Sequence, residues 1–273
     1  MKFQNANLNP KLKKYIHHIS FNEFVPDDDN FIRVMPDCMT ELVINFGNSY
    51  QRTRGEKNEL INVKGSHFIG IKNNYCLVKP IPQMKRVSVR FKPGAISLFT
   101  GCSSQKFCNE VIDAELIFGK EIKVLENEIC EINDEKKIRT NIESFLLKKL
   151  NLNIQALETI NTVNSIYRNP SLTKVEGIKN ENSNYKQLER RFTKYIGLPP
   201  KSVIKIIQFN YSTKIKYENP RLSLTQIAYH SGYYDQAHFI KNFKQFSGLL
   251  PKQYFPTQSL MSHSNQLVIN RQF

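Results

Sequence analysis

The sequence predicts an α+β protein, with a β-rich N-terminal half built as a barrel or sandwich with some helices, and an all-α C-terminal half. Three observations lead to this prediction. Short runs of alternating or β-branched residues recur through the first half, apolar residues follow helical spacing in the second, and a two-helix pattern occurs twice in that second half. With 273 residues, the chain is long enough to bury a sizeable core.

The N-terminal half contains short strand-like runs separated by turn-forming residues such as Gly47-Asn48-Ser49 and Lys72-Asn73-Asn74. The runs occupy residues 31–35, 41–46, 61–71, 75–81 and 85–93. Short strands at this spacing are typical of a small barrel or sandwich. After Gly94 the pattern becomes helical, and the helical segments are residues 94–100, 122–133 and 135–150.

An asparagine-rich segment at residues 151–153 is the predicted boundary between the halves. It separates a domain at 1–150 from a helical domain at 151–257, which a tail at 258–273 follows. In the helical domain, apolar residues fall at every third position from Ile154 to Ile166, and Pro170 ends that segment. Further helices are predicted from Pro199 to about Tyr217, and within residues 223–255.

The helical half contains an internal repeat. Ser171-Leu172-Thr173 recurs as Ser223-Leu224-Thr225, and the segment LERRFTKYIGLPPK at 188–201 recurs as FIKNFKQFSGLLPK at 239–252. Each copy reads as a short helix, a tight turn and a longer helix that closes with Gly-x-x-Pro. This is the helix-turn-helix arrangement, whose second helix can enter a DNA major groove.

The second copy has the local chemistry that such a turn needs. Ala228 is small enough for two helices to approach closely, Gly232 can adopt a positive φ, and Asp235 can cap the longer helix. The first copy departs from this pattern, because Glu176 replaces the alanine and the turn at 177–183, which includes Asn180, is one residue longer.

On a helical wheel, each longer helix has an aromatic face and an opposite polar or cationic face. The predicted core positions are Leu188, Phe192 and Tyr195 in the first copy and Phe239, Phe243 and Phe246 in the second. The predicted DNA-binding residues are Lys186, Gln187, Arg190, Arg191, Lys194, Gln236, Ala237, His238, Lys241 and Lys244. Phosphate contacts are expected from Lys174, Lys201, Arg191 and Lys194.

The charge distribution agrees with a polyanionic partner. The chain has a formal net charge of +15, from 39 basic and 24 acidic residues. Residues 1–150 hold 23 basic and 18 acidic side chains (net +5), and residues 151–273 hold 16 and 6 (net +10). Five cysteines without a C-x-x-C pair, no apolar run of membrane-spanning length and no apolar signal segment favour a cytoplasmic protein with reduced thiols and no membrane partner.

Residues 154–255 resemble the DNA-binding domain of AraC/XylS-type transcription regulators, most closely over 222–255 and its closing Gly-x-x-Pro segment. The resemblance implies two helix-turn-helix lobes reading promoter DNA, with base contacts at Lys186, Gln187, Arg190, Gln236, Ala237, His238 and Lys241. It also implies RNA polymerase as a partner. The N-terminal half is similar, at 35–45 and 89–95, to a β-rich domain that often precedes this module and that senses a small-molecule effector or dimerises.

Several residues have simpler explanations. The basic helix faces could be solvated surface, and His238 could flank the core. His17, His18 and His67 lack metal-ligand spacing, so structural roles are favoured. Asp37 and Glu41 are expected to cap a loop or form a buried hydrogen bond, and Cys102 and Cys108 to be free thiols. We expect no catalytic residue, metal or cofactor.

The sequence therefore predicts a sequence-specific, DNA-binding transcription regulator that is not an enzyme. Two alternatives stay open, namely an enzymatic N-terminal domain fused to a DNA-binding module, and a non-specific nucleic-acid binder driven by charge. A homodimer is possible through the apolar stripe of helix 135–150, although packing of that stripe against its own β domain is favoured.

Overall fold

The computed structural model describes residues 2–4, 8–24, 31–55, 57–79, 84–178 and 184–260. The strands are β1 (Lys2–Gln4), β2 (Ile16–Phe24), β3 (Ile32–Val34), β4 (Thr40–Asn45), β5 (Tyr50–Arg54), β6 (Glu59–Val63), β7 (His67–Ile69), β8 (Cys76–Lys79), β9 (Met84–Phe91) and β10 (Val111–Asp113). The helices before the predicted boundary are α1 (Pro10–Lys13), α2 (Ser97–Thr100), η1 (Ser104–Phe107), α3 (Glu115–Phe118), α4 (Glu121–Cys130) and α5 (Glu135–Lys149). Those after it are α6 (Ile154–Arg168), η2 (Val175–Ile178), α7 (Tyr185–Tyr195), α8 (Pro200–Glu218), α9 (Leu224–His230), α10 (Gln236–Ser247) and α11 (Pro251–Leu260).

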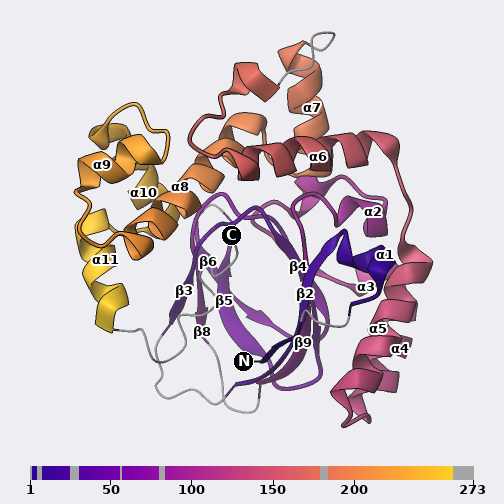
Figure 1. Ribbon diagram of the computed structural model, residues 1–273. Helices are drawn as coiled ribbons and strands as arrows, with labels where there is room; N and C mark the ends of the chain where they lie inside the picture. Colours follow the sequence, from indigo (N-terminus) through magenta and orange to yellow (C-terminus); the bar gives the residue numbers. More distant parts are fainter. Residues whose placement is uncertain are drawn as a thin grey trace.

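The strands form two antiparallel sheets that face each other in the N-terminal half (Figure 1). The larger sheet has the order β1-β2-β9-β4-β7-β10, and the smaller has the order β3-β8-β5-β6. Among the described residues no ladder joins the two sheets into one closed barrel, so the sandwich is the alternative that the chain adopts.

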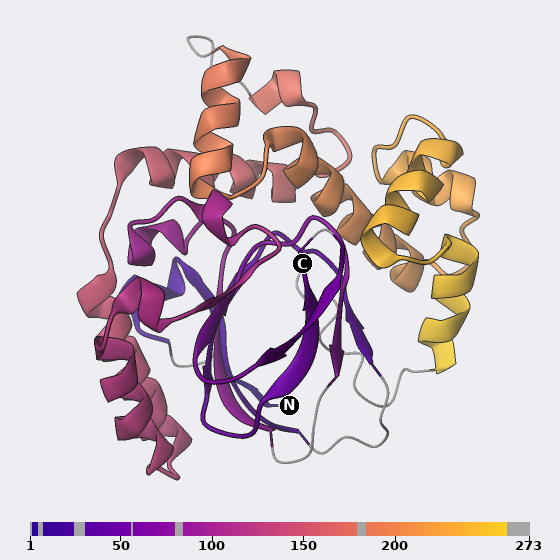
Figure 2. The ribbon, with the colours of Figure 1, turned by 180° about the vertical axis from the view of Figure 1, so that it is seen from behind.

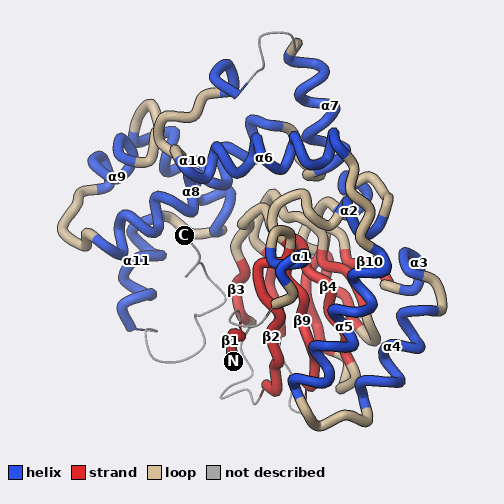
Figure 3. The backbone as a smooth tube through the Cα atoms, turned by 45° about the vertical axis from the view of Figure 1, so that its right-hand side comes forward, coloured by secondary structure: helices blue, strands red, loops and turns tan. Residues whose placement is uncertain are grey.

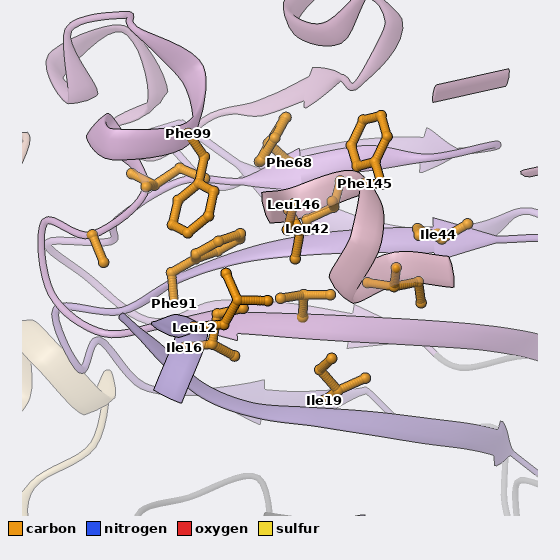
Figure 4. Close-up of a cluster of buried hydrophobic side chains, with 14 of the residues drawn as sticks. Leu12, Ile16, Ile19, Leu42, Ile44, Phe68, Phe91, Phe99, Phe145 and Leu146 are labelled. Atoms are coloured by element: carbon orange, nitrogen blue, oxygen red, sulfur yellow. The ribbon is translucent and has the colours of Figure 1, made fainter. Parts of the chain in front are cut away.

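One face of the larger sheet packs against the helices α1 to α5 (Figure 3). Strand pairing places Leu42 beside Val89 and Ile44 beside Val87, all on that face. The helices contribute Leu12, Phe99, Phe145 and Leu146 to the same core (Figure 4). The apolar stripe of α5 is thus buried against its own β domain, as the sequence favoured, and does not offer a dimer surface.

Sequence periodicity found part of the sheets. Each of the five predicted runs contains a strand, but the run at 61–71 is two strands, because the chain leaves the smaller sheet after Val63 and enters the larger sheet at His67, with a positive φ of 67 at Gly65 between them. The short strands β1 and β10 and the longer strands β2 and β5 were not predicted. The signal is missing for a clear reason in β2 and β5. Polar or charged residues fill five of the nine positions of β2 and four of the five positions of β5, so neither shows the apolar alternation that predicts a strand.

The helical half packs around a second core, with its two helix-turn-helix copies at the two ends of α8 (Figure 2). Both predicted helices α6 and α8 are present, and α11 continues past residue 255 to Leu260. Helix α6 contributes to both cores, since Ala156 and Ile160 pack with the β domain while Val163 and Ile166 pack with the helices. The predicted boundary at 151–153 lies in the loop before α6.

The first copy differs from the prediction in its short helix. The expected helix at 172–178 is reduced to the single 3₁₀ turn η2. Most of the turn that follows, 179–183, lies outside the described residues, and so does Asn180. The second copy forms a full α9, and the Ser223 side chain and the Gln226 side chain cap it reciprocally.

The loop Met35–Cys38 joins the two halves. The Asp37 carboxylate pairs with the Arg90 guanidinium and accepts a hydrogen bond from the Met39 backbone at 3.1 Å. The Asp37 carbonyl accepts from the Tyr167 hydroxyl at 2.9 Å, and the Pro36 carbonyl accepts from Asn210 at 3.0 Å. The expected buried hydrogen-bonding role of Asp37 is therefore confirmed.

None of the helices in the described part of the chain is long and apolar enough to cross a membrane.

Three histidines of the β domain are held neutral by their surroundings. Burial, with Arg90 nearby, lowers the pKa of His17 to about 4 and that of His18 to about 3. Burial also lowers the pKa of His67 to about 4, against the opposing hydrogen bond to the Gly65 carbonyl. A protonated imidazole is therefore disfavoured in the folded state.

We expect the free energy of unfolding to fall as the pH drops below about 6.5, because the unfolded chain then binds protons that the folded chain excludes. Each histidine adds a slope of at most about 1.4 kcal/mol per pH unit between its unfolded and folded pKa values. Urea denaturation at pH 7, 6 and 5 measures this slope, which His67→Gln should flatten. The exposed His230→Gln is the control, and an equal slope in all three proteins would contradict the expectation.

A second prediction concerns the turn between α9 and α10. Gly232 has φ 84, and a Cβ there would lie 2.5 Å from the Ser171 carbonyl oxygen. Gly101 has φ 64 but open space around it. Replacing Gly232 with alanine should therefore lower the free energy of unfolding by about 3 kcal/mol. Gly101→Ala should lower it by about 1 kcal/mol, because that variant has only the unfavourable positive φ and no clash. Urea denaturation compares the two, and equal losses would show that the contact with Ser171 is unimportant.

Candidate nucleic-acid interface

Helix α7 is fixed by a cap at its start and an apolar face behind it. The Asn184 side chain accepts a hydrogen bond from the Gln187 backbone at 2.9 Å, which satisfies one of the free N–H groups of the first turn. Leu188, Phe192 and Tyr195 are buried on the inner face, as the helical wheel predicted. The outer face of α7 is therefore presented to solvent in one orientation.

The outer face of α7 is cationic. Lys186, Gln187, Arg190 and Lys194 are exposed, whereas Arg191 is half-buried and pairs with Glu158 of α6 at 3.2 Å. The exposed residues have the long polar or cationic side chains that contact bases or phosphates. Because Arg191 already forms an ion pair with Glu158, its side chain is better placed to contact a phosphate than to extend to a base.

A groove of about 350 Å³ lies between α6 and α7. It is lined by Gln155, Gln187, Arg190, Arg191, Lys194 and Tyr195. The Tyr195 hydroxyl donates a hydrogen bond to the Gln155 side-chain oxygen at 3.0 Å. Sequence reasoning missed Gln155, because it lies on α6, outside the internal repeat that pointed to the other lining residues.

Helix α10 is fixed in the same way as α7. The Asp235 carboxylate accepts from the His238 backbone at 2.7 Å, which confirms the predicted cap. Phe239, Phe243 and Phe246 are buried, and Phe209 of α8 packs edge-on against Phe243 with ring centroids 5.0 Å apart. Such aromatic pairs add specific packing to their burial, so α10 is held firmly against α8.

The outer face of α10 is partly free and partly engaged. Ala237, Lys241 and Lys244 are exposed. The Gln236 side chain accepts a hydrogen bond from the Thr225 hydroxyl at 2.6 Å, and the His238 ring lies edge-on to the Tyr233 ring at 5.5 Å. His238 thus flanks the core as well as bordering the outer face.

Two exposed tyrosines lie next to α10 and were not singled out from the sequence. Tyr229 is 61% exposed and Tyr234 is 87% exposed, so both are open to a partner. Their polar neighbours and irregular spacing gave no periodic signal. The two lysines expected to contact phosphate, Lys174 and Lys201, are also exposed. A role in DNA binding stays a prediction for all the residues of this surface.

The residues considered for other chemistry form no catalytic or metal-binding cluster among the described residues, although Cys108 lies beside Glu189 and Thr193 of α7. Among the described residues, no group of three or more histidines, cysteines, aspartates or glutamates is arranged to hold a metal ion. Cys102 and Cys108 are not joined by a disulfide, as expected. Nδ1 of His67 donates to the Gly65 carbonyl at 2.9 Å and Nε2 accepts from the Tyr50 hydroxyl at 2.8 Å, so His67 has a structural role.

Solved structures of ToxT from Vibrio cholerae are similar to this chain at low sequence identity. A structure from strain O395 is 15% identical, covers 86% of this chain and 95% of its own, and gives a TM-score of 0.45. Another ToxT structure from Vibrio cholerae, in the P21 crystal form, is 16% identical, covers 86% and 97%, and gives 0.48. A fatty-acid-bound ToxT from strain SCE256 is 15% identical, covers 91% and 96%, and gives 0.48.

Sequence-family models match part of each half of the chain. No curated protein sequence matches the chain. Residues 9–113 match a family described as a domain of unknown function, and residues 179–256 match the family described as a helix-turn-helix domain. The latter range contains α7, α8, α9 and α10, the elements of the cationic surface described above. Residues 179–256 are thus a helix-turn-helix domain of the AraC type, the class of DNA-binding domain that the sequence predicted.

Proposed function

We propose that the protein binds promoter DNA with both lobes, with α7 and α10 entering successive major grooves. The observation that carries this proposal is a matched pair of helices, each with a buried aromatic face and a cationic outer face, at the two ends of one helix. Helix α8 has 19 residues and ten buried positions, so it is a packed rod about 28 Å long. Successive major-groove faces on one side of B-DNA are about 34 Å apart.

Base contacts are proposed for the residues that reach outward. Arginine and lysine suit guanine and glutamine suits adenine, so Lys186, Gln187 and Arg190 form the reading set of α7. In α10, the corresponding set is Gln236, Ala237, His238 and Lys241.

The groove beside α7 is proposed to seat the DNA backbone. Arg191, Lys194 and Gln155 line it, and their cationic and amide groups suit a phosphate oxygen. Lys174, Lys201 and Lys244 are proposed as further phosphate contacts. Such contacts set position and affinity but carry no direct sequence information.

The N-terminal half is proposed to modulate DNA binding through a small-molecule effector or by self-association. It contacts both lobes, since Ser104 donates to the Tyr195 carbonyl at 2.8 Å and Arg33 donates to the Ser247 carbonyl at 3.1 Å. These contacts lie at the C-terminal ends of α7 and α10. A conformational change in the β domain would therefore be transmitted to both α7 and α10 through these two hydrogen bonds. RNA polymerase is the proposed partner at the promoter.

Selection of bound sequences from a random double-stranded library, with the full-length protein at physiological salt, tests the proposal. Two short boxes about one helical turn apart are expected. A single box would restrict base reading to one lobe. No enrichment, with affinity lost steeply as salt rises, would overturn sequence-specific binding and favour a charge-driven binder.

Substitutions in the two reading sets should act on specificity. Arg190→Ala and Lys241→Ala should each weaken binding to the selected site by about 1–3 kcal/mol and relax the preference at one base pair. Binding titrations on the selected site and on single-base variants measure both effects.

The control is Lys137→Ala, an exposed lysine of α5 in the N-terminal half, which should leave binding unchanged. Lys194→Ala should weaken binding by the same factor on all DNA sequences. It should also reduce the slope of the logarithm of the binding constant against the logarithm of the salt concentration by about one, because one phosphate contact is lost. If Arg190→Ala behaves like Lys194→Ala, the assignment of Arg190 to base reading is wrong.

A further inference from the structure

One side-chain hydrogen bond joins the two helices of the second lobe on their solvent side. The Thr225 hydroxyl, in the first turn of α9, donates to Oε1 of Gln236, the first residue of α10, at 2.6 Å. The two residues are 11 positions apart in the chain, so the hydrogen bond spans the turn between the helices. It therefore ties a residue proposed to contact bases to the helix that precedes it.

The backbone that carries these two side chains is fixed. Helices α9 and α10 pack against each other (Figure 1), and a side chain caps the first turn of each. Between them, Ala228 is fully buried, and its carbonyl accepts a hydrogen bond from the Tyr233 backbone at 3.0 Å. The Thr225 hydroxyl and the Gln236 amide are therefore held close together by the fold of the lobe.

The matching position in the first copy of the repeat is Thr173, the last residue of the repeated Ser-Leu-Thr segment. Its hydroxyl donates to the Asn169 carbonyl at 2.6 Å, within its own segment of the chain. The residue that corresponds to Gln236 is Tyr185, which has no amide to orient. As far as the structure describes the first lobe, it therefore has no counterpart of the hydrogen bond between α9 and α10.

A glutamine amide can face a base in two ways. Its carbonyl oxygen is an acceptor and its NH₂ group is a donor, and a half-turn of the amide exchanges the two. In the major groove, guanine and thymine present a keto oxygen, whereas adenine and cytosine present an amino group. A glutamine that turns freely can pair with adenine through both of its groups or donate to a keto base, so by itself it discriminates poorly between them.

We propose that Thr225 is a positioning residue that sets the base preference of Gln236. Because the Thr225 hydroxyl donates to Oε1, the NH₂ group is the part of the amide left to face DNA, and Gln236 acts as a hydrogen-bond donor. The base that it reads is then a keto base, guanine or thymine, since the amino group of adenine or cytosine would meet another donor. This inference rests on the proposed function and adds the chemical class of base that α10 accepts at one position.

Selection from a random double-stranded library, with full-length wild-type protein and variants, tests the role of Thr225. The position that Gln236 contacts is the one whose preference is lost in Gln236→Ala. At that position, Thr225→Val, which removes the hydroxyl and keeps the shape, should reduce the preference for a keto over an amino base from about tenfold to below about twofold. Thr225→Ser keeps the hydroxyl and should keep the preference. The control is Thr173→Val, which should change the preference at no position.

A second pair of variants separates positioning from a merely structural role. In Gln236→Glu both side-chain oxygens are acceptors, so the preference at the same position should change from a keto to an amino base on the same strand. Adding Thr225→Val to Gln236→Glu should leave that preference unchanged, because a carboxylate has no donor to orient. If Thr225→Val weakens binding equally at all positions, with glutamine and with glutamate alike, Thr225 only stabilises the lobe and the inference is wrong.

The orientation of the amide is measured separately, without DNA. The NMR order parameter of the Gln236 side-chain nitrogen in the full-length protein should fall in Thr225→Val and stay unchanged in Thr173→Val. If no protein selects a sequence, the proposed function is rejected, and the order parameter still shows whether Thr225 holds the amide. A selected motif whose preference survives Thr225→Val, or in which no position responds to Gln236→Ala, would reject this inference alone.

Discussion

The ion pair between Asp37 and Arg90 is the constraint on which the arrangement of the two halves depends. It fixes the loop Met35–Cys38 to the larger sheet, and the carbonyls of that loop accept hydrogen bonds from Tyr167 and Asn210 of the helical half. Both partners are largely buried, so removing one would leave an uncompensated charge in the interior. The loop also places Met35 and Cys38 in the helical core, which makes the two halves one packed unit.

The recognition surface depends on what lies behind it. Phe192 in α7 and Phe243 in α10 are fully buried and hold each helix in one rotation. The residues that remain outside are those that a DNA partner can contact, and the helical half carries most of the excess positive charge of the chain. Charge therefore supplies attraction to DNA, while the buried aromatic rings supply the fixed geometry that sequence reading requires.

Strand β9 separates two environments within the β domain. Its alternate residues Val87 and Val89 lie in the helix-side core, whereas Arg86 and Ser88 face the smaller sheet. Folding is driven on the first side by burial of apolar area. On the second side, Nε of Arg86 and Oγ of Ser88 are buried without a hydrogen bond to any described residue, which costs stability. The fold thus tolerates a polar interior because its apolar core lies on the other face.

The sequence by itself determined the elements whose signals are local. The repeat and its spacing predicted the two helix-turn-helix copies. Asp235 predicted the start of α10, Gly232 predicted the turn before it, and apolar alternation predicted most strands. Only the tertiary structure showed that β2 and β5 are strands. Contacts with strands distant in the chain stabilise their polar residues, and such contacts leave no local sequence pattern. The tertiary structure also decided that η2 is one turn, that α6 serves both cores, and that Gln155 lines the groove, since each depends on neighbours far apart in the chain.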